Sequence, residues 1–198
     1  MSRTSIRRAV SLSTALMMIC APVAAQQQIQ MVIDRSLTDD PPYTAIYPDV
    51  IQTADDGNPQ TILTLHHPDL PMQCDVFVYP DAPEGWSAEG ALGAFDPARV
   101  EAAWAPSYPG FRVTAQSVVN FASGPALRFE GTSENSPFGV PVATIHAEAV
   151  ANGRTYAITC ASATEVADRT RTLIDFVIAN FSTNSDGQCC INPADDRG

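Results

Sequence analysis

An alternation of apolar and polar residues between positions 111 and 162 constrains the fold of this chain more than any other feature. In the stretch 111–121 the odd positions are mostly apolar and the even positions mostly polar, and the stretches 125–132, 142–150 and 154–162 repeat the pattern. A period of two is typical of a strand with one buried face and one exposed face. The sequence therefore predicts four consecutive strands.

The turns between these stretches predict how the strands pair. Asn152 and Gly153 form the strongest two-residue hairpin signal in the chain, and Ser123-Gly124-Pro125 separates the first two stretches. Strands joined by a tight turn must run antiparallel. We expect an antiparallel sheet with a polar loop over 133–139.

An amphipathic helix is predicted directly after the last strand. Ser162 and Glu165 have the spacing of a capping box, in which the serine would begin the helix. Apolar residues then recur at steps of three and four, which defines one broad stripe. The stripe consists of Val166, Thr170, Leu173, Ile174, Val177, Ile178 and Phe181. This helix is expected to lie on the sheet.

Shorter elements are predicted upstream. The runs 61–66 and 73–79 are rich in β-branched and aromatic residues, which favours a hairpin across the intervening prolines. Ser87 can cap a following helix, and Asp96-Pro97 can restart it, since proline fits the first helical position. We expect one interrupted helix that ends after Trp104.

The remaining segments divide the chain. Residues 26–60 are rich in proline and glycine, which predicts an extended arm with turns and one short strand around 30–33. Residues 61–181 form the expected α+β domain, an antiparallel β-sheet packed against helices. Residues 182–198 are polar and are predicted to be a tail.

The first 25 residues have the three-part plan of a secretory signal peptide. Arg3, Arg7 and Arg8 precede an apolar run over 9–21, and small residues follow up to Ala25. The run is too short for a permanent membrane span. The sequence therefore predicts export, and we expect a periplasmic protein.

The charge balance excludes some partners. The formal net charge is −11, with 22 acidic residues against 11 basic ones. Nucleic acids and anionic lipid surfaces both require a basic footprint. We therefore expect neither nucleic-acid binding nor direct binding to an anionic membrane.

Cysteines fit export to an oxidising compartment. Removal of the leader takes Cys20 and leaves Cys74, Cys160, Cys189 and Cys190, an even number that allows three pairings. Both Cys74 and Cys160 fall in predicted strands, so a bridge between them is our first choice. The pairing of the adjacent Cys189 and Cys190 stays undecided. Either they are free thiols, or they pair with Cys74 and Cys160 and fasten the tail to the domain.

The order of elements resembles the PsbP-like fold family, which includes bacterial envelope proteins of the LpqN type. The resemblance covers about 61–181 and includes Pro83-Glu84-Gly85-Trp86, the segment 153–160 with Tyr156 and Cys160, and the ending 176–181. It implies a PsbP-like α/β/α sandwich, and it implies binding or assembly work rather than chemistry.

Catalytic motifs are absent from the sequence. There is no nucleophile elbow, phosphate-binding loop or dinucleotide fingerprint. His66, His67 and His146 could meet Asp69 or Glu148 in a metal site, but adjacent histidines on a strand point to opposite faces. We expect no catalytic residue, no cofactor and no metal.

The favoured function is an exported, non-catalytic binding or accessory subunit of the cell envelope. Its expected partner is a protein, and a membrane-associated complex is one form that this partner could take. Two alternatives remain open: a metal-dependent hydrolase that uses His146, and a thiol-redox envelope protein that uses Cys189 and Cys190.

Overall fold

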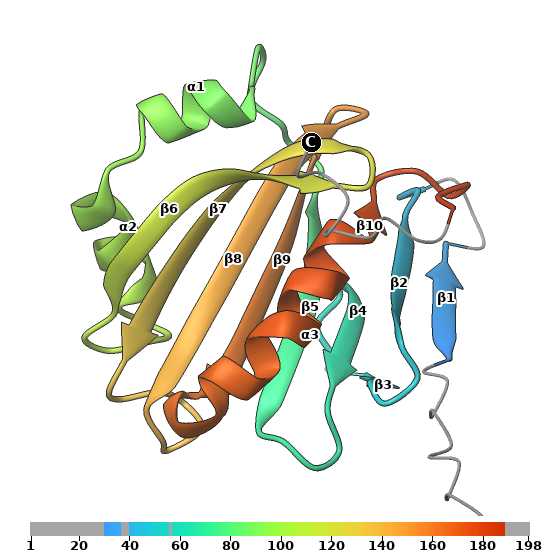
Figure 1. The fold of residues 1–198 in the computed structure, drawn as a ribbon. Helices are drawn as coiled ribbons and strands as arrows, with labels where there is room; N and C mark the ends of the chain where they lie inside the picture. The colour runs from blue at the N-terminus through green and yellow to red at the C-terminus, as the bar shows by residue number, and fades with distance from the viewer. Residues whose placement is uncertain (1–29, 37–39, 56, 189–198) are drawn as a thin grey trace, which may run out of the picture.

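A seven-stranded antiparallel sheet forms the centre of the protein, with strands in the order β3-β4-β5-β9-β8-β7-β6 (Figure 1). The computed structural model describes residues 30–36, 40–55 and 57–188. The strands are β3 (Gln52–Ala54), β4 (Thr61–His66), β5 (Met72–Tyr79), β6 (Arg112–Phe121), β7 (Gly124–Ser133), β8 (Val142–Ala151) and β9 (Arg154–Ala163).

The four predicted strands are β6 to β9, and each pairs antiparallel with the next. The hairpin between β8 and β9 turns at Asn152 and Gly153, whose φ angles of 54° and 70° require residues that tolerate the left-handed region. A register shift between Val113 and Ala115 interrupts the alternation in β6. The prediction of an antiparallel sheet is confirmed.

Helices cover both faces of the sheet, which confirms the predicted sandwich (Figure 1). On one side lie α1 (Ala88–Gly93) and α2 (Pro97–Trp104), and on the other lies α3 (Ala167–Ala179). The predicted caps are present: Gly90 N donates to Ser87 Oγ at 3.1 Å, and Ala98 N donates to Asp96 Oδ1 at 3.0 Å. These two bonds satisfy amides that have no partner within the helix.

The predicted capping box at Ser162 and Glu165 is wrong. Ser162 is a buried residue of β9, paired with Met72 on one side and Ala143 on the other. A short 3₁₀ turn, Thr164–Val166, follows without a side-chain cap, and only then does α3 begin. Pairing on both sides of β9 holds Ser162 in extended backbone, so the chain leaves the sheet later than the local motif suggests.

The segment predicted as an extended arm contributes three strands. β1 (Met31–Arg35), at the position of the predicted short strand, pairs with β2 (Thr44–Pro48), and β3 extends the large sheet beside β4. Every residue of β2 is buried. Tertiary packing, which proline and glycine content does not report, gives this stretch its order.

The ending of the predicted helix also differs. Phe181 lies outside α3, in the short strand β10 (Phe181–Ser182), which pairs with β2 to complete a small sheet in the order β1-β2-β10. The first residues of the predicted tail are held there as well. Thr44 Oγ1 donates to Asn184 O at 2.7 Å and accepts from Gly187 N at 3.1 Å.

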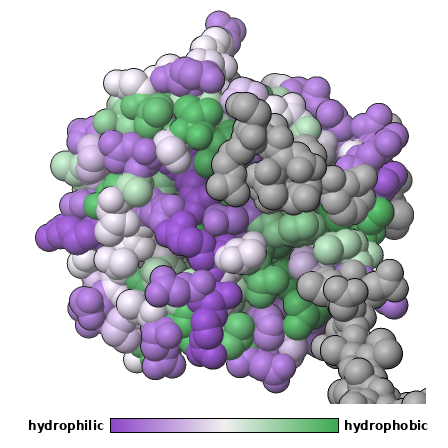
Figure 2. Space-filling model, viewed as in Figure 1, coloured by the Kyte–Doolittle hydropathy of each residue, from purple (hydrophilic) through white to green (hydrophobic). Residues whose placement is uncertain are grey.

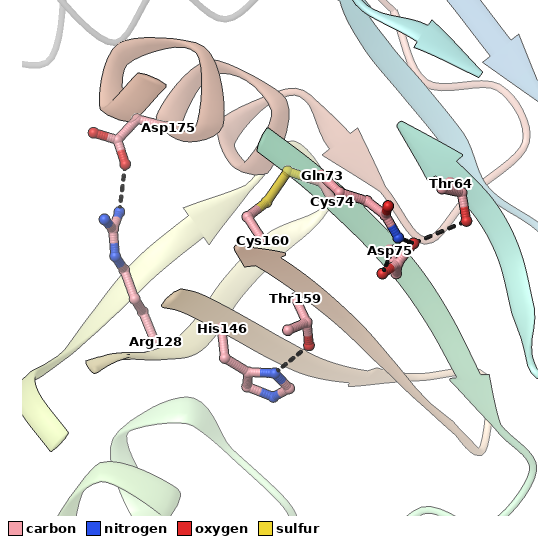
Figure 3. Close-up of a disulfide and its surroundings, with 9 residues drawn as sticks. All are labelled: Thr64, Gln73, Cys74, Asp75, Arg128, His146, Thr159, Cys160 and Asp175. Atoms are coloured by element: carbon pink, nitrogen blue, oxygen red, sulfur yellow. Dashed lines mark hydrogen bonds and ion pairs between the residues drawn. A yellow bond between two sulfur atoms is a disulfide. The ribbon is translucent and has the colours of Figure 1, made fainter. Parts of the chain in front are cut away.

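One hydrophobic core lies between the large sheet on one side and α3 with the small sheet on the other. Its members include Leu65, Val76, Tyr156, Ile158, Ile178 and Phe181, each at most 2% exposed. The Cys74–Cys160 disulfide crosses this core surface and joins β5 to β9 at directly paired positions (Figure 3). The structure thus has the bridge that was our first choice, whereas Cys189 and Cys190 lie outside the described residues.

Removal of the disulfide should destabilise the protein. The bridge closes a loop with a sequence separation of 86, which restricts the unfolded chain. The variant Cys74→Ala/Cys160→Ala is expected to lose about 2–5 kcal/mol in the free energy of unfolding. Urea unfolding of the variant and the oxidised parent measures the difference, and equal midpoints would contradict the prediction.

An ion-pair network joins α3 to the sheet. Arg128 is 8% exposed, and its Nη1 donates to Asp175 Oδ1 at 2.7 Å (Figure 3). Its Nη2 lies 2.8 Å from Glu130 Oε1, and Glu130 also accepts a hydrogen bond from Arg171 Nη1 at 3.1 Å. A guanidinium group as buried as that of Arg128 needs such partners. Figure 2 shows hydrophilic side chains along the middle of this face, between hydrophobic areas.

Replacement of Glu130 should change how stability depends on pH. The hydrogen bond from Arg171, followed by the charges of Arg128 and Arg171, lowers the pKa of Glu130 despite its burial. A lowered carboxylate pKa adds stability that is complete above the unfolded pKa, near about 4.3, and is lost as the pH falls through the folded pKa. Glu130→Gln should therefore cost about 1–3 kcal/mol at pH 7 and much less at acidic pH.

Urea unfolding at pH 7 and in acid checks this expectation. The exposed Glu134, in the loop after β7, provides the matched control, and Glu134→Gln should leave stability nearly unchanged at both values. A loss for Glu130→Gln that is the same at both pH values would mean that Glu130 acts only through packing.

Candidate binding face

The side of the sheet opposite α3 is only partly covered, and we call it the open face. α1 contacts β6 and β7, and α2 contacts β6. The middle of the open face is formed by β5, β9 and β8, where Asp75, Phe77 and Thr159 are half-buried. Because side chains alternate along a strand, these residues point away from the core that holds Cys74 and Cys160.

His146 lies on the open face under the end of α2. Its ring stacks on Phe129, with centroids 4.7 Å apart, and meets the edge of Trp104 at 5.5 Å. His146 Nδ1 is 2.9 Å from Thr159 Oγ1, as Figure 3 shows, and Nε2 is 3.5 Å from Glu148 Oε2. The imidazole is therefore packed and hydrogen-bonded, with 12% of its side chain exposed.

The row Thr159–His146–Glu148 has the order of a nucleophile, a base and an orienting acid. A hydroxyl nucleophile also needs nearby amide donors for the oxyanion that forms. Thr159 pairs with Asp75 on one side and His146 on the other, so its own backbone is committed to the sheet. His146 thus has an ordered place between Phe129, Trp104 and Thr159, and the expectation of no catalytic residue stays a prediction.

Asp75 is the polar centre of the open face. Its Oδ1 accepts from Thr64 Oγ1 at 2.8 Å, and Gln73 Nε2 lies 3.0 Å from each carboxylate oxygen (Figure 3). Tyr108, just after α2, is close enough for the charge of Asp75 to affect the pKa of its hydroxyl. Burial raises the pKa of the Tyr108 hydroxyl, and the negative charge of Asp75 raises it further.

Asp75→Asn should lower the pKa of Tyr108. Removal of the negative charge takes away the smaller cause, whereas burial remains, so the pKa is expected to fall but to stay above its ordinary value of about 10. A titration that follows the ζ-carbon resonance of Tyr108 measures the shift. Asp81→Asn, at an exposed position just after the same strand, is the control, and an unchanged pKa in Asp75→Asn would contradict this placement of Tyr108.

A groove lies between the helices and the open face, and its volume is in the range of about 300–1,000 Å³ that is typical of ligand sites. Its volume is about 600 Å³, and it lies between α1–α2 and the strands β7, β8 and β9, with the end of β5 at one side. Its apolar lining includes Tyr79, Phe95, Val100, Trp104, Leu127, Phe129 and Ala157. Its charged and polar lining comprises Asp81, Asp96, Arg99, His146, Glu148 and Thr155.

The groove is acidic, since three carboxylates face one arginine. Tyr79 at its edge is 38% exposed, and burial together with the charge of Glu148 raises its pKa. An aromatic floor with a charged rim is typical of surfaces that bind other molecules.

The other candidate residues are dispersed. His66, the last residue of β4, pairs with Gln52 on one side and Gln73 on the other, and His67 Nδ1 accepts from Asp69 N and Leu70 N. Within residues 30–36, 40–55 and 57–188, no group of three or more His, Cys, Asp or Glu side chains is arranged to hold a metal ion. The expectation that the chain holds no metal or cofactor stays a prediction.

The sequence did not point to Asp75, Tyr108 or Thr159 as parts of one surface. Period two alone places Asp75 and Thr159 opposite the cysteines, and that signal was available. The position of Tyr108 depends on how the chain leaves α2, which no local pattern encodes.

In the part of the chain that the structure describes, no helix is long and apolar enough to span a membrane.

Comparisons with known proteins identify the fold. No protein-family model matches the sequence, and no curated protein matches it. The solution structure of cyanobacterial PsbP (CyanoP) from Synechocystis sp. PCC 6803 is similar, with a TM-score of 0.56, 12% identity, and coverage of 82% of this chain and 98% of that one. The Saccharomyces cerevisiae Ran-binding protein Mog1p has a TM-score of 0.52, 10% identity, and coverage of 79% and 96%.

LpqN from Mycobacterium tuberculosis, involved in cell envelope biogenesis, has 16% identity, covers 80% of this chain and 86% of that one, and has a TM-score of 0.42, too low for a structural argument. The similarity to the first two structures shows that this chain has the PsbP-like fold. At these identities it establishes the fold alone.

Proposed function

We propose that this protein is exported to the periplasm and acts there as a non-catalytic binding or accessory subunit of the cell envelope. The proposed contact surface for its protein partner is the groove beside the open face. The observation that carries the proposal is the incomplete cover of one sheet face, where aromatic side chains such as Trp104 and Tyr79 line a groove of about 600 Å³.

The size and lining of the groove support a protein partner. It is open to solvent, and its Trp104 and Tyr79 are of the residue types that supply most binding energy in protein interfaces. The carboxylates of Asp81, Asp96 and Glu148 favour a partner segment with positive charge, because complementary charges speed association and suppress wrong partners. We therefore propose a basic segment of a partner protein as the occupant.

Export is supported by two independent features. The first 25 residues have the plan of a signal peptide. The Cys74–Cys160 disulfide fits an oxidising compartment, where such bonds form and persist. One structural neighbour, yeast Mog1p, is described as Ran-binding, which agrees with protein binding on this fold.

Capture from the envelope fraction tests the proposal. The full chain, tagged and exported in its native host, should retain a specific partner protein. Ala103→Arg places a long cation on the groove wall and should reduce capture about tenfold or more, which corresponds to about 1.4 kcal/mol. Ala102→Arg, on the neighbouring exposed position of α2 outside the groove lining, should leave capture unchanged.

Three results would contradict the proposal. Absence of any captured protein from the wild-type chain would argue against an accessory role. Equal capture by Ala103→Arg and the wild type would place the interface elsewhere. Turnover of an ester or phosphate substrate that His146→Ala abolishes would show an enzyme.

A further inference from the structure

A second cavity lies at the opposite end of the open face. Its volume is about 410 Å³, and it is bordered by the β4–β5 loop, the β7–β8 loop and the ends of β5, β8 and β9. The apolar lining consists of Leu70, Pro71, Met72, Phe138, Val140, Val142, Ala161 and Ala163. His67, Gln73 and Ser162 are the polar lining residues.

The mouth of the cavity exposes large apolar side chains. Phe138 is 57% exposed and Val140 is 41% exposed, although both belong to a loop that polar residues could have filled. Among the described residues only six large hydrophobic side chains are exposed to this degree, and two of them stand at this mouth. Such a concentration marks a site for an apolar ligand or partner.

Hydrogen bonds hold both loops of the mouth in place. Ser136 Oγ donates to Val140 O at 2.5 Å and accepts from Phe138 N at 3.2 Å, which fixes the β7–β8 loop. His67 Nδ1 accepts from Asp69 N at 3.1 Å and from Leu70 N at 3.2 Å, which fixes the β4–β5 loop. The cavity is therefore formed before any ligand enters, which reduces the entropy cost of binding.

The same bonds determine what His67 presents to the cavity. A nitrogen that accepts two backbone N–H groups carries no proton, so the proton of the neutral ring is on Nε2. His67 thus supplies one N–H donor at the edge of an otherwise mostly apolar site. Such a donor matches a carbonyl-type oxygen on a ligand.

The volume favours a small molecule over a protein side chain. An engineered cavity of about 150 Å³ holds one benzene ring, whereas small-molecule sites span roughly 300–1,000 Å³. The cavity of about 410 Å³ falls in the second class. We propose that it binds a small, mostly apolar molecule that carries one carbonyl oxygen, which accepts a hydrogen bond from His67 Nε2. This site is separate from the groove proposed for the protein partner.

Titration with 2-octanone, observed by ¹H–¹⁵N NMR of the full chain, tests the site. The ketone should shift the amide signals of Leu70, Ala161 and Ala163 in a saturable way. Signals of the groove around Ala103 should stay in place, which separates this test from that of the proposed protein interface. Failure to saturate, or shifts confined to other regions, would overturn the proposal.

Two variants identify the determinants. Val140→Trp fills the mouth from an exposed loop position and should weaken binding about tenfold or more. His67→Asn retains an acceptor for the amides of Asp69 and Leu70 but removes the distal donor, so it should weaken binding about five- to tenfold.

The outcomes separate the possible occupants. Unchanged ketone affinity in Val140→Trp would overturn the site, and unchanged affinity in His67→Asn would overturn the assigned hydrogen bond. Loss of protein capture in Val140→Trp without any effect on the ketone would show that a partner's side chain occupies the cavity, contrary to the proposal.

Discussion

The pairing of β5 with β9 is the contact on which the rest of the structure depends. β5 belongs to the β4–β5 hairpin and β9 to the β8–β9 hairpin, and eight consecutive residue pairs join them, with the Cys74–Cys160 disulfide among them. Without this pairing the sheet would separate into β3-β4-β5 and β9-β8-β7-β6. Pairing so distant in sequence costs loop entropy, which the covalent bond offsets by restricting the unfolded chain.

The two faces of this central pair differ in burial. On the side of α3 its residues are the disulfide, Tyr156 and Ile158, all fully buried. On the other side its residues are Asp75, Phe77 and Thr159, which no helix covers completely. The fully buried contacts of β5 and β9 therefore lie on one face. The other face has the groove and the cavity, both of which include residues of these two strands.

Local periodicity predicted the strands β6 to β9, the first hairpin and the caps at Ser87 and Asp96, because each depends on neighbours in sequence. It failed at Ser162 and Phe181, where pairing with distant strands overrides a helical motif. The buried strand β2 was missed for the same reason. The candidate binding surfaces were harder still, since the positions of Tyr108 and His67 depend on loops whose paths the sequence does not specify.

The small sheet has a consequence for the order in which the chain can fold. β2 is buried throughout, yet its partner β10 is the last strand of the described chain. Its buried residues Ala45, Ile46 and Tyr47 therefore belong to a strand that lacks the contacts of α3 and β10 until Phe181 has been synthesised. A chain built in this way cannot complete its small sheet during synthesis until the segment after α3 has been made.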